Sequence, residues 1–348
     1  MKKLLKKLKM VVQTAKPRLL FKLLKIKAVE KLTGRLPAFR QVEIQITFAC
    51  NLRCRHCSTT SFDLSKNHLT IDDYRRIARQ CRQNNVAMVS FTGGEPLYDP
   101  RIEKIIGVFD TGATLVSITT NGTLLTPELA QRLKRLGVDN LTISLDGDTP
   151  ETNDAIRGQG TFHKILEAIG IALTNRLSVI VIYTLSHKSI SDGIFDRMIH
   201  FCAERGLTLH VSLAAPVGNW CDPKAAEEYV LTPKDIAYLT KCQARYPFLR
   251  RDLDGNFTKR GCPAGTERFV ISPFGDVLCC TKIQACFGNV KESSMLELAR
   301  KMKEYEFIRS SPPVCLVAED KKFLDTYLPR LAKNTKLPVS AQEYFNER

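Results

Sequence analysis

Residues 41–57 read QVEIQITFACNLRCRHC and join a strand pattern to a cysteine-rich loop. The apolar, β-branched run over 42–48 predicts a buried strand. Cys50, Cys54 and Cys57 follow it within eight residues. Thiolates are soft ligands that suit iron–sulfur clusters or zinc, but a structural zinc site closes with four ligands. His56 is the only local candidate for a fourth ligand and is adjacent to Cys57, so the spacing favours an iron–sulfur cluster.

The segment that follows alternates strand patterns with amphipathic helical patterns. Such alternation, with strands that are apolar almost throughout, predicts a parallel sheet with helical crossovers. The pattern alone fits a partial barrel and an open doubly wound sheet equally well. Six strands are expected at 42–48, 87–92, 114–120, 140–145, 178–185 and 208–213, and helices at 71–84, 101–109, 127–136, 162–175 and 193–205.

Glycine-rich and polar segments follow the second, third and fourth of these strands. Catalytic and binding residues gather at the carboxyl ends of parallel strands in both candidate folds. These segments and the three cysteines are therefore expected together at that rim of the sheet. Each segment also has a plain structural interpretation as turn chemistry. The segments are Thr92-Gly93-Gly94-Glu95-Pro96, Thr120-Asn121-Gly122 and Ser144-Leu145-Asp146-Gly147.

A second group of cysteines surrounds a predicted β-hairpin over residues 269–280. Apolar alternation on either side of the Pro-Phe-Gly-Asp turn at 273–276 is typical of such a hairpin. The cysteines of this group are Cys262, Cys279, Cys280, Cys286 and Cys315.

Composition excludes several classes of protein. The chain has 348 residues, 44% hydrophobic and 25% charged, which argues against a disordered or fibrous protein. It contains no apolar run of about 18 residues that would span a bilayer. Its 12 cysteines favour metal ligation in a reducing cytoplasm, since disulfide scaffolds are usually short and secreted.

The net charge of +16 is concentrated in residues 1–40, which hold 13 Lys or Arg and one acid. The other 308 residues therefore carry only +4. Apolar residues recur in this stretch at helical spacing, and Pro17 predicts two short helices. A Lys-rich amphipathic helix suits an anionic membrane surface, here through residues 1–36, or a protein partner. Phe21 is the only aromatic residue among the first 30, which argues against a nucleic-acid arm.

Cys-x3-Cys-x2-Cys after a first strand and Gly-Gly-Glu-Pro after a second resemble the radical S-adenosylmethionine (SAM) superfamily over residues 43–220. The resemblance implies a partial (β/α)6 TIM-like barrel. It also implies a [4Fe–4S] cluster on Cys50, Cys54 and Cys57, with SAM on the remaining iron. Residues implied to hold SAM are Gly93, Gly94, Glu95, Pro96, Asn121, Ser144, Asp146 and Arg157, although a solvated surface charge is an equal interpretation of Arg157.

The second cysteine group resembles the C-terminal auxiliary-cluster extension called SPASM, or its shorter form, the twitch domain. Cys262, Gly275 and Cys280 match its spacing, but only Cys315 stands where a full SPASM domain has four further cysteines. The resemblance therefore implies one auxiliary [4Fe–4S] cluster on Cys262, Cys280, Cys315 and either Cys286 or Cys279. The domains expected are a basic tail (1–40), a core barrel (41–235), an auxiliary-cluster domain (236–318) and a C-terminal tail (319–348).

The function implied is reductive cleavage of SAM and abstraction of a hydrogen atom from a substrate, with oxidation or cross-linking assisted by the auxiliary cluster. Peptide maturation, or modification of lipids or glycans at a membrane, are the alternatives. RNA modification and a non-catalytic iron–sulfur protein are further hypotheses, the last disfavoured because an electron carrier needs no open iron. The expected electron donor is a flavodoxin or ferredoxin, and the expected location is the cytoplasm or the inner membrane face.

Overall fold

The computed structural model describes residues 16–33, 39–60, 62, 65–221, 227–255, 261–327 and 337–345. The first of the two predicted basic helices, before Pro17, lies outside these residues. The second is α2 (Pro17–Thr33), which begins at the proline, as expected for a residue that fits the first turn of a helix.

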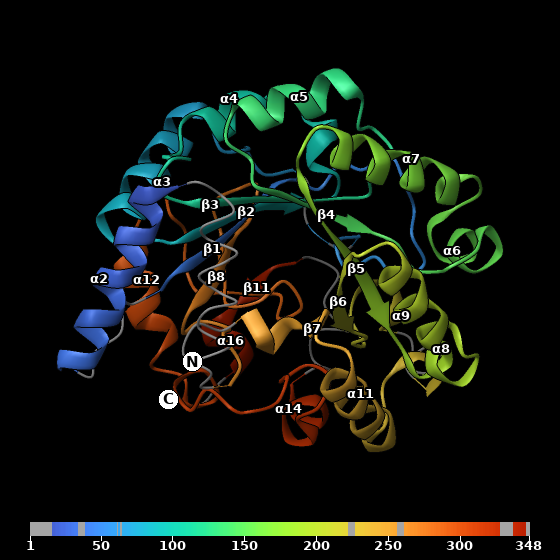
Figure 1. The fold of residues 1–348 in the computed structure, drawn as a ribbon. Helices are drawn as coiled ribbons and strands as arrows, with labels where there is room; N and C mark the ends of the chain where they lie inside the picture. Colours follow the sequence, from blue (N-terminus) through green and yellow to red (C-terminus); the bar gives the residue numbers. More distant parts are fainter. Residues whose placement is uncertain are drawn as a thin grey trace.

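The centre of the molecule is a curved sheet of nine strands in the order β7-β6-β5-β4-β3-β2-β1-β8-β9 (Figure 1). Neighbouring strands are parallel except β8 and β9, which form the predicted hairpin. The strands are β1 (Gln41–Thr47), β2 (Met88–Gly93), β3 (Leu115–Thr120), β4 (Asn140–Ser144), β5 (Ser178–Leu185), β6 (Thr208–Leu213), β7 (Leu249–Arg251), β8 (Arg268–Ile271) and β9 (Val277–Leu278).

Helices cover the outer face of this sheet (Figure 1). Several begin at an N-cap residue that can be recognised in the sequence, such as Thr126 before Pro127 and Thr232 before Pro233. From β1 to residue 302 the described α-helices are α3 (Ile71–Gln83), α4 (Ile102–Gly107), α5 (Pro127–Arg135), α6 (Pro150–Arg157), α7 (Thr161–Thr174), α8 (His187–Ser191), α9 (Ile194–Glu204), α11 (Pro233–Arg245) and α12 (Met295–Met302).

Short elements complete the described chain. A two-stranded parallel sheet joins β10 to β11, so residues near the C-terminus pack beside the second cysteine group. The elements are the 3-10 turns η1 (Pro96–Tyr98), η2 (Gly218–Trp220) and η3 (Asp252–Gly255), with β10 (Ala285–Cys286), α13 (Glu306–Arg309), α14 (Lys321–Thr326), β11 (Val339–Ser340) and α16 (Ala341–Phe345).

The predicted partial barrel with a small C-terminal domain is confirmed, and all six predicted strands lie within a residue or two of their expected bounds. The predicted hairpin does not stand apart, because β8 pairs in parallel with β1 and extends the barrel sheet. Helix α11 runs across the boundary expected at residue 235, and β7 after it pairs with β6. The bounds of the four expected domains remain predictions.

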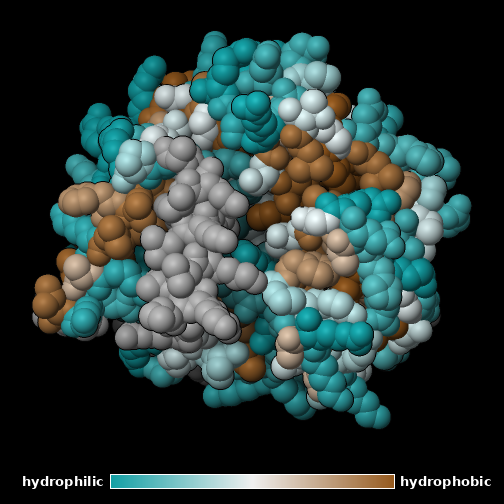
Figure 2. All heavy atoms as spheres, in the orientation of Figure 1, coloured by the Kyte–Doolittle hydropathy of each residue, from teal (hydrophilic) through white to brown (hydrophobic). Residues whose placement is uncertain are grey.

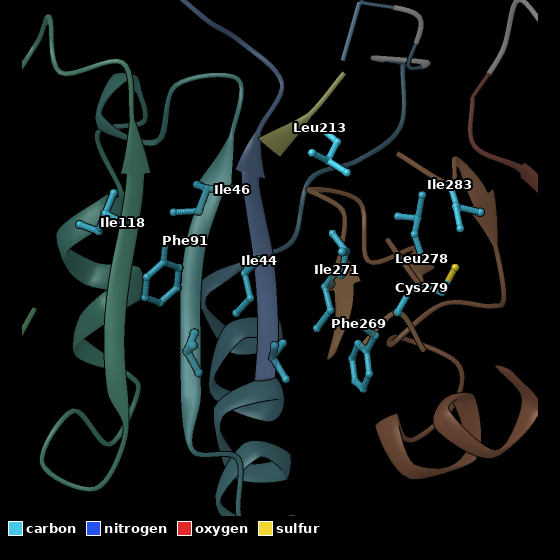
Figure 3. Close-up of a cluster of buried hydrophobic side chains, with 14 of the residues drawn as sticks. Ile44, Ile46, Phe91, Ile118, Leu213, Phe269, Ile271, Leu278, Cys279 and Ile283 are labelled. Carbon is cyan, nitrogen blue, oxygen red and sulfur yellow. The ribbon is translucent and has the colours of Figure 1, made fainter. Parts of the chain in front are cut away.

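Alternating side chains divide the sheet into an apolar face and a more polar one. Figure 3 shows Ile44, Phe91, Ile118 and Ile271 from four adjacent strands in one buried apolar cluster. The positions between them are frequently polar, as in the buried Gln45 of β1. The strands are therefore less uniformly apolar than expected, because one face lines a lumen that carries polar chemistry.

Candidate active site

The Cys50–Cys57 loop follows β1 and is clamped by the segment after β6. The Asn219 backbone N–H donates to the Cys57 carbonyl oxygen at 3.0 Å, and its side-chain amide donates to the Cys54 carbonyl at 3.2 Å. Gly218 has a φ of +59°, and a Cβ there would stand 2.1 Å from the Cys57 carbonyl oxygen. Only glycine fits this approach, so η2 fixes the loop from the opposite side of the barrel.

Gly93 and Gly94 let β2 approach the backbone of β1. A Cβ on Gly93 would lie 2.2 Å from the Thr47 carbonyl oxygen, and one on Gly94 would lie 2.4 Å from the Ala49 carbonyl oxygen. The Gly94 N–H also donates to Thr47 at 2.6 Å. The sequence suggested that these glycines make room for a ligand. They do border the cavity, but the close contact that requires them is with the strand leading into the cysteine loop.

Glu95 is completely buried and ties the end of β2 to the end of β3. Its carboxylate accepts hydrogen bonds from the Leu97 N–H at 2.9 Å, the Thr120 hydroxyl at 2.7 Å and the Asn121 N–H at 2.7 Å. Burial raises the pKa of Glu95, and these donors oppose that shift. The Thr120 and Asn121 donors hold the end of β3 in place, while the expected contact of Glu95 with SAM remains a prediction.

Asp146, at the end of β4, is the centre of a buried charge cluster. Its carboxylate accepts from Arg157 Nη2 at 2.7 Å, is 2.5 Å from His56 Nε2, and accepts from the Thr184 N–H at 2.8 Å. Burial alone would raise the pKa of Asp146, but Arg157 and His56 hold it well below its usual value. His56 also meets the edge of Trp220, with ring centroids 5.6 Å apart, so it links the cysteine loop to both β4 and η2.

Arg157 and Ser144 provide donors suited to an anionic ligand. Arg157 is only 7% exposed and lines the cavity, yet its buried Nε donates to no acceptor in the described chain. Ser144 lines the same cavity and its hydroxyl makes no hydrogen bond within the described residues. A buried unpaired donor is costly, so the expected SAM carboxylate fits here. The solvated-charge interpretation of Arg157 is therefore wrong.

The cavity measures about 240 Å³ and is bordered by the cysteine loop and by Lys282, which follows Cys280 by two residues. Its wall includes a hydroxyl-bearing residue from each of five consecutive strands. Thr92 and Ser144 were expected at this rim from the sequence. The other three could have been found from the polar residues that recur at every second position of the strands. The hydroxyl-bearing residues are Thr92, Thr119, Ser144, Thr184 and Ser212.

The three loop thiols border this cavity in a partly buried position. Burial raises the pKa of Cys50, and it raises the pKa of Cys54 to about 11 against the opposing effect of Arg157. Metal ligation removes such protons. Across the described residues, no three Cys, His, Asp or Glu side chains are already arranged as a metal site.

Cys262, Cys280 and Cys315 lie close enough to influence one another. Burial raises the pKa of Cys262 to about 11 and that of Cys315 to about 12, and in each case neighbouring cysteines add to the shift. Two loops bring them together: the Cys262 N–H donates to Pro312 at 2.7 Å, and the Cys315 N–H donates to Glu319 at 2.7 Å. These three residues are the expected ligands of the auxiliary cluster.

The two candidates for a fourth ligand occupy different surroundings. The pKa of Cys279 is raised by burial and then by the Cys280 and Cys262 thiols. Cys286 has Asp276 as its main charged neighbour, and its Sγ is 3.3 Å from the Gly288 carbonyl oxygen. The arrangement favours Cys279 as the fourth ligand of the auxiliary cluster. The spacing of the cysteines along the chain left both Cys279 and Cys286 open.

A partly buried charge network that was not expected from the sequence lies between the barrel lumen and the auxiliary cysteines. His210 Nε2 on β6 is 3.1 Å from Asp252 Oδ1, and Lys282 donates to the Leu213 carbonyl at 2.6 Å. Arg268 on β8 lies near Cys262 and Cys280 as well as Asp252. Burial raises the pKa of Glu43 on β1, an effect opposed by Arg268. Charged residues inside strand patterns, such as Glu43 in β1, were the feature of the sequence that could have indicated this network.

Residues 44–202 match the Radical SAM superfamily, and residues 262–318 match the SPASM iron–sulfur cluster-binding domain. The first match covers the cysteine loop and the strands β2 to β5, and the second covers the second cysteine group, in the expected order. The chain belongs to the radical SAM superfamily and carries a C-terminal SPASM iron–sulfur domain.

Two relatives illustrate the range of this superfamily. A probable GTP 3′,8-cyclase of Methanocella arvoryzae is 33% identical over 171 residues, which are 49% of this chain and 55% of that protein. A mycofactocin maturase, MftC, of Mycobacterium tuberculosis is 28% identical over 255 residues, 68% of this chain and 63% of that protein. The chain thus spans less than two thirds of either relative.

The fold resembles that of Streptococcus suis SuiB bound to its precursor peptide SuiA. The TM-score is 0.62 with 19% sequence identity, over 79% of this chain and 67% of the other. At this identity the likeness supports the architecture alone.

We predict that Gly94→Ala destabilises the fold by about 1–3 kcal/mol, because the added Cβ collides with the Ala49 carbonyl oxygen. Gly170→Ala is the matched control. Gly170 lies inside α7, where a Cβ would meet nothing within 4 Å, so alanine should stabilise by up to about 1 kcal/mol. Urea unfolding of both variants measures the difference, and equal effects would contradict it.

We predict that Asp146→Asn lowers the free energy of unfolding by about 3–5 kcal/mol, because it leaves the buried Arg157 without its charge partner. Asp72→Asn serves as the control, since the Asp72 side chain is 84% exposed in its pair with Arg75 and should change stability by less than about 1 kcal/mol. Denaturant unfolding at pH 7 compares them. If Asp146→Asn lowers the free energy of unfolding no more than Asp72→Asn does, the charge cluster around Asp146 contributes nothing to stability.

We predict that Cys315→Ala removes about half of the iron bound after anaerobic reconstitution, while Cys286→Ala retains it. The reason is the location of Cys315 beside Cys262 and Cys280, which Cys286 does not share. Iron and sulfide analysis measures this, and the visible charge-transfer absorption provides a second readout. Equal iron loss in the two variants would place Cys286 among the ligands.

Proposed function

We propose that this chain is an enzyme that cleaves SAM reductively and uses the resulting radical to abstract a hydrogen atom from a substrate. The observation that carries the proposal is the Cys50–Cys57 loop, clamped at the rim of a cavity that is also lined by Arg157, whose Nε is unpaired within the described chain. When bound, a [4Fe–4S] cluster with one iron free of protein ligands supplies the electron that splits SAM into methionine and a 5′-deoxyadenosyl radical.

The chain's own residues bind and orient the ligand. Arg157, held by Asp146 at 2.7 Å, presents a fixed guanidinium to the SAM carboxylate. Ser144 and the neighbouring strand hydroxyls offer hydrogen bonds to the rest of the molecule. Trp220 is only 6% exposed and stacks on Tyr229 with ring centroids 4.3 Å apart, so it closes one side of the cavity against water.

An oxidative outcome is supported by the position of the second cysteine group. Cys50 and Lys282 both line the cavity, and Lys282 follows Cys280 by two residues. A substrate in this cavity would therefore lie between the two cluster sites. An auxiliary cluster there is suited to accept the electron that a substrate radical releases, which gives oxidation or cross-linking.

Peptide maturation is the second candidate function. It is supported by the likeness to mycofactocin maturase, which extends over 68% of this chain. A non-catalytic iron–sulfur protein is disfavoured because electron transfer needs neither a ligand cavity nor the unpaired donor of Arg157. The proposed electron donor is a flavodoxin or ferredoxin, whose acidic surface would complement a chain of net charge +16. The proposed compartment is the reducing cytoplasm.

We predict that the anaerobically reconstituted chain forms 5′-deoxyadenosine from SAM and dithionite, and that changing any one of Cys50, Cys54 or Cys57 to Ala abolishes this. Each change removes a thiolate from a site that has only three. Liquid chromatography with mass spectrometry measures the product. Cys242→Ala, on α11 outside the cavity, is the control and should keep the activity.

Persistent 5′-deoxyadenosine formation in the triple variant would refute the assignment of the loop. Cys280→Ala separates the two cluster sites, because it should leave 5′-deoxyadenosine formation intact while abolishing conversion of the substrate. Equal substrate conversion with and without Cys280 would refute the auxiliary role. Anaerobic incubation with cell extract and with candidate precursor peptides distinguishes a small-molecule substrate from a peptide.

A further inference from the structure

Helix α2 is attached to the catalytic body by one face. Lys16, directly before it, donates to the Thr114 and Gly137 carbonyls at 3.1 and 3.0 Å and pairs with Asp139 at 2.5 Å. On the helix itself, Leu19 and Ile26 are buried, seven residues apart on the same face. Lys22 lies between them and donates to the Val86 carbonyl at 2.9 Å. These contacts fix which face of α2 points outward.

The outward side of α2 is unusually apolar. Six large hydrophobic residues of the described chain are exposed, and four of them belong to this helix. Hydrophobic side chains are visible along α2 at the left edge of Figure 2, next to hydrophilic ones. The four residues are Phe21 (72% exposed), Leu24 (55%), Val29 (41%) and Leu32 (84%).

Basic side chains flank this apolar strip. Lys25 and Lys31 are exposed and make no ion pair or hydrogen bond within the described chain, and Lys27 pairs only weakly with Glu30 at 3.5 Å. Phe21, Leu24 and Leu32 recur at spacings of three and eight, so they share one side of the helix between the lysines. An exposed apolar strip bordered by lysines is the composition of a helix that lies in a membrane interface.

We propose that the outer face of α2 binds the surface of an anionic phospholipid bilayer. Its lysines complement the lipid charge and its apolar strip fits the boundary between headgroups and acyl chains. The sequence before α2 repeats this composition, with Lys2, Lys3, Lys6, Lys7 and Lys9 between leucines and methionine. No helix of the described residues is long and apolar enough to cross a bilayer.

The attachment of α2 also sets the orientation of the bound enzyme. Val86, Thr114, Gly137 and Asp139 precede β2, β3 and β4, so α2 lies at the edge where these strands begin. The cysteine loop and the cavity lie at the opposite edge, where the strands end. A chain held by α2 therefore turns its cavity away from the lipid. In this orientation the cavity and the proposed lipid contact lie at opposite edges of the sheet, and the proposal is independent of the reaction proposed above.

Vesicle flotation of the full chain tests the proposal, with phosphatidylcholine vesicles prepared with and without phosphatidylglycerol. The chain should float with the anionic vesicles. The variant Phe21→Asp/Leu24→Asp/Leu32→Asp should reduce this partitioning at least about 30-fold, because charged groups replace the apolar strip. Lys25→Glu/Lys31→Glu keeps the strip and should reduce partitioning about 25-fold, at about fivefold for each lysine.

A control variant carries the same change in net charge as the Phe21 variant, at exposed positions away from α2: Gln131→Asp/Leu173→Asp/Gln342→Asp. It should partition within about twofold of the unchanged chain, and circular dichroism checks that all variants fold. Equal flotation of the α2 variants and the control would overturn the proposal. So would a concentration-dependent dimer, seen by analytical ultracentrifugation, that the Phe21 variant abolishes without any vesicle binding by the unchanged chain.

Discussion

The close backbone contact between the end of β1 and the start of the Gly93–Glu95 segment is the constraint on which the site depends. Two consecutive glycines at the end of β2 meet carbonyl oxygens of Thr47 and Ala49 at distances that exclude a Cβ. This contact fixes the point at which the chain leaves β1 and enters the cysteine loop. Because Glu95 follows immediately and binds Thr120 and Asn121, the same contact also positions the end of β3. A local packing requirement therefore sets the geometry of three loops.

Two further contacts extend this arrangement around the rim. Asp146 joins the cysteine loop, through His56, to Arg157 at the end of α6. Asn219 joins the loop to the segment after β6. The cavity enclosed by these contacts reaches Lys282, two residues after Cys280. The network thus explains how one barrel can hold the proposed SAM site close to the proposed auxiliary site, and why most of its side chains position the loops.

The strands, the cysteine loop and the hairpin were predicted well from the sequence, because each depends on local periodicity or spacing. The pairing of β8 with β1 could not be predicted in this way, since that contact joins residues more than 200 positions apart. The close contact of Gly93 and Gly94 with Thr47 and Ala49 could not be predicted either, because the strand that they approach is distant in sequence. The network of Glu43, His210, Asp252 and Lys282 was missed for the same reason: single polar residues in separate elements acquire meaning only when the barrel brings them together.

The Cys50–Cys57 loop is proposed to hold a cluster whose remaining iron binds SAM, and the function of the chain depends on this site. Electron paramagnetic resonance of the dithionite-reduced protein tests it most directly. A variant in which Cys262, Cys280 and Cys315 are changed to Ala isolates the signal of the loop. We predict that adding SAM changes the g values of this signal, because an amino and a carboxylate group then bind to iron. A spectrum that is identical with and without SAM would contradict the proposed site.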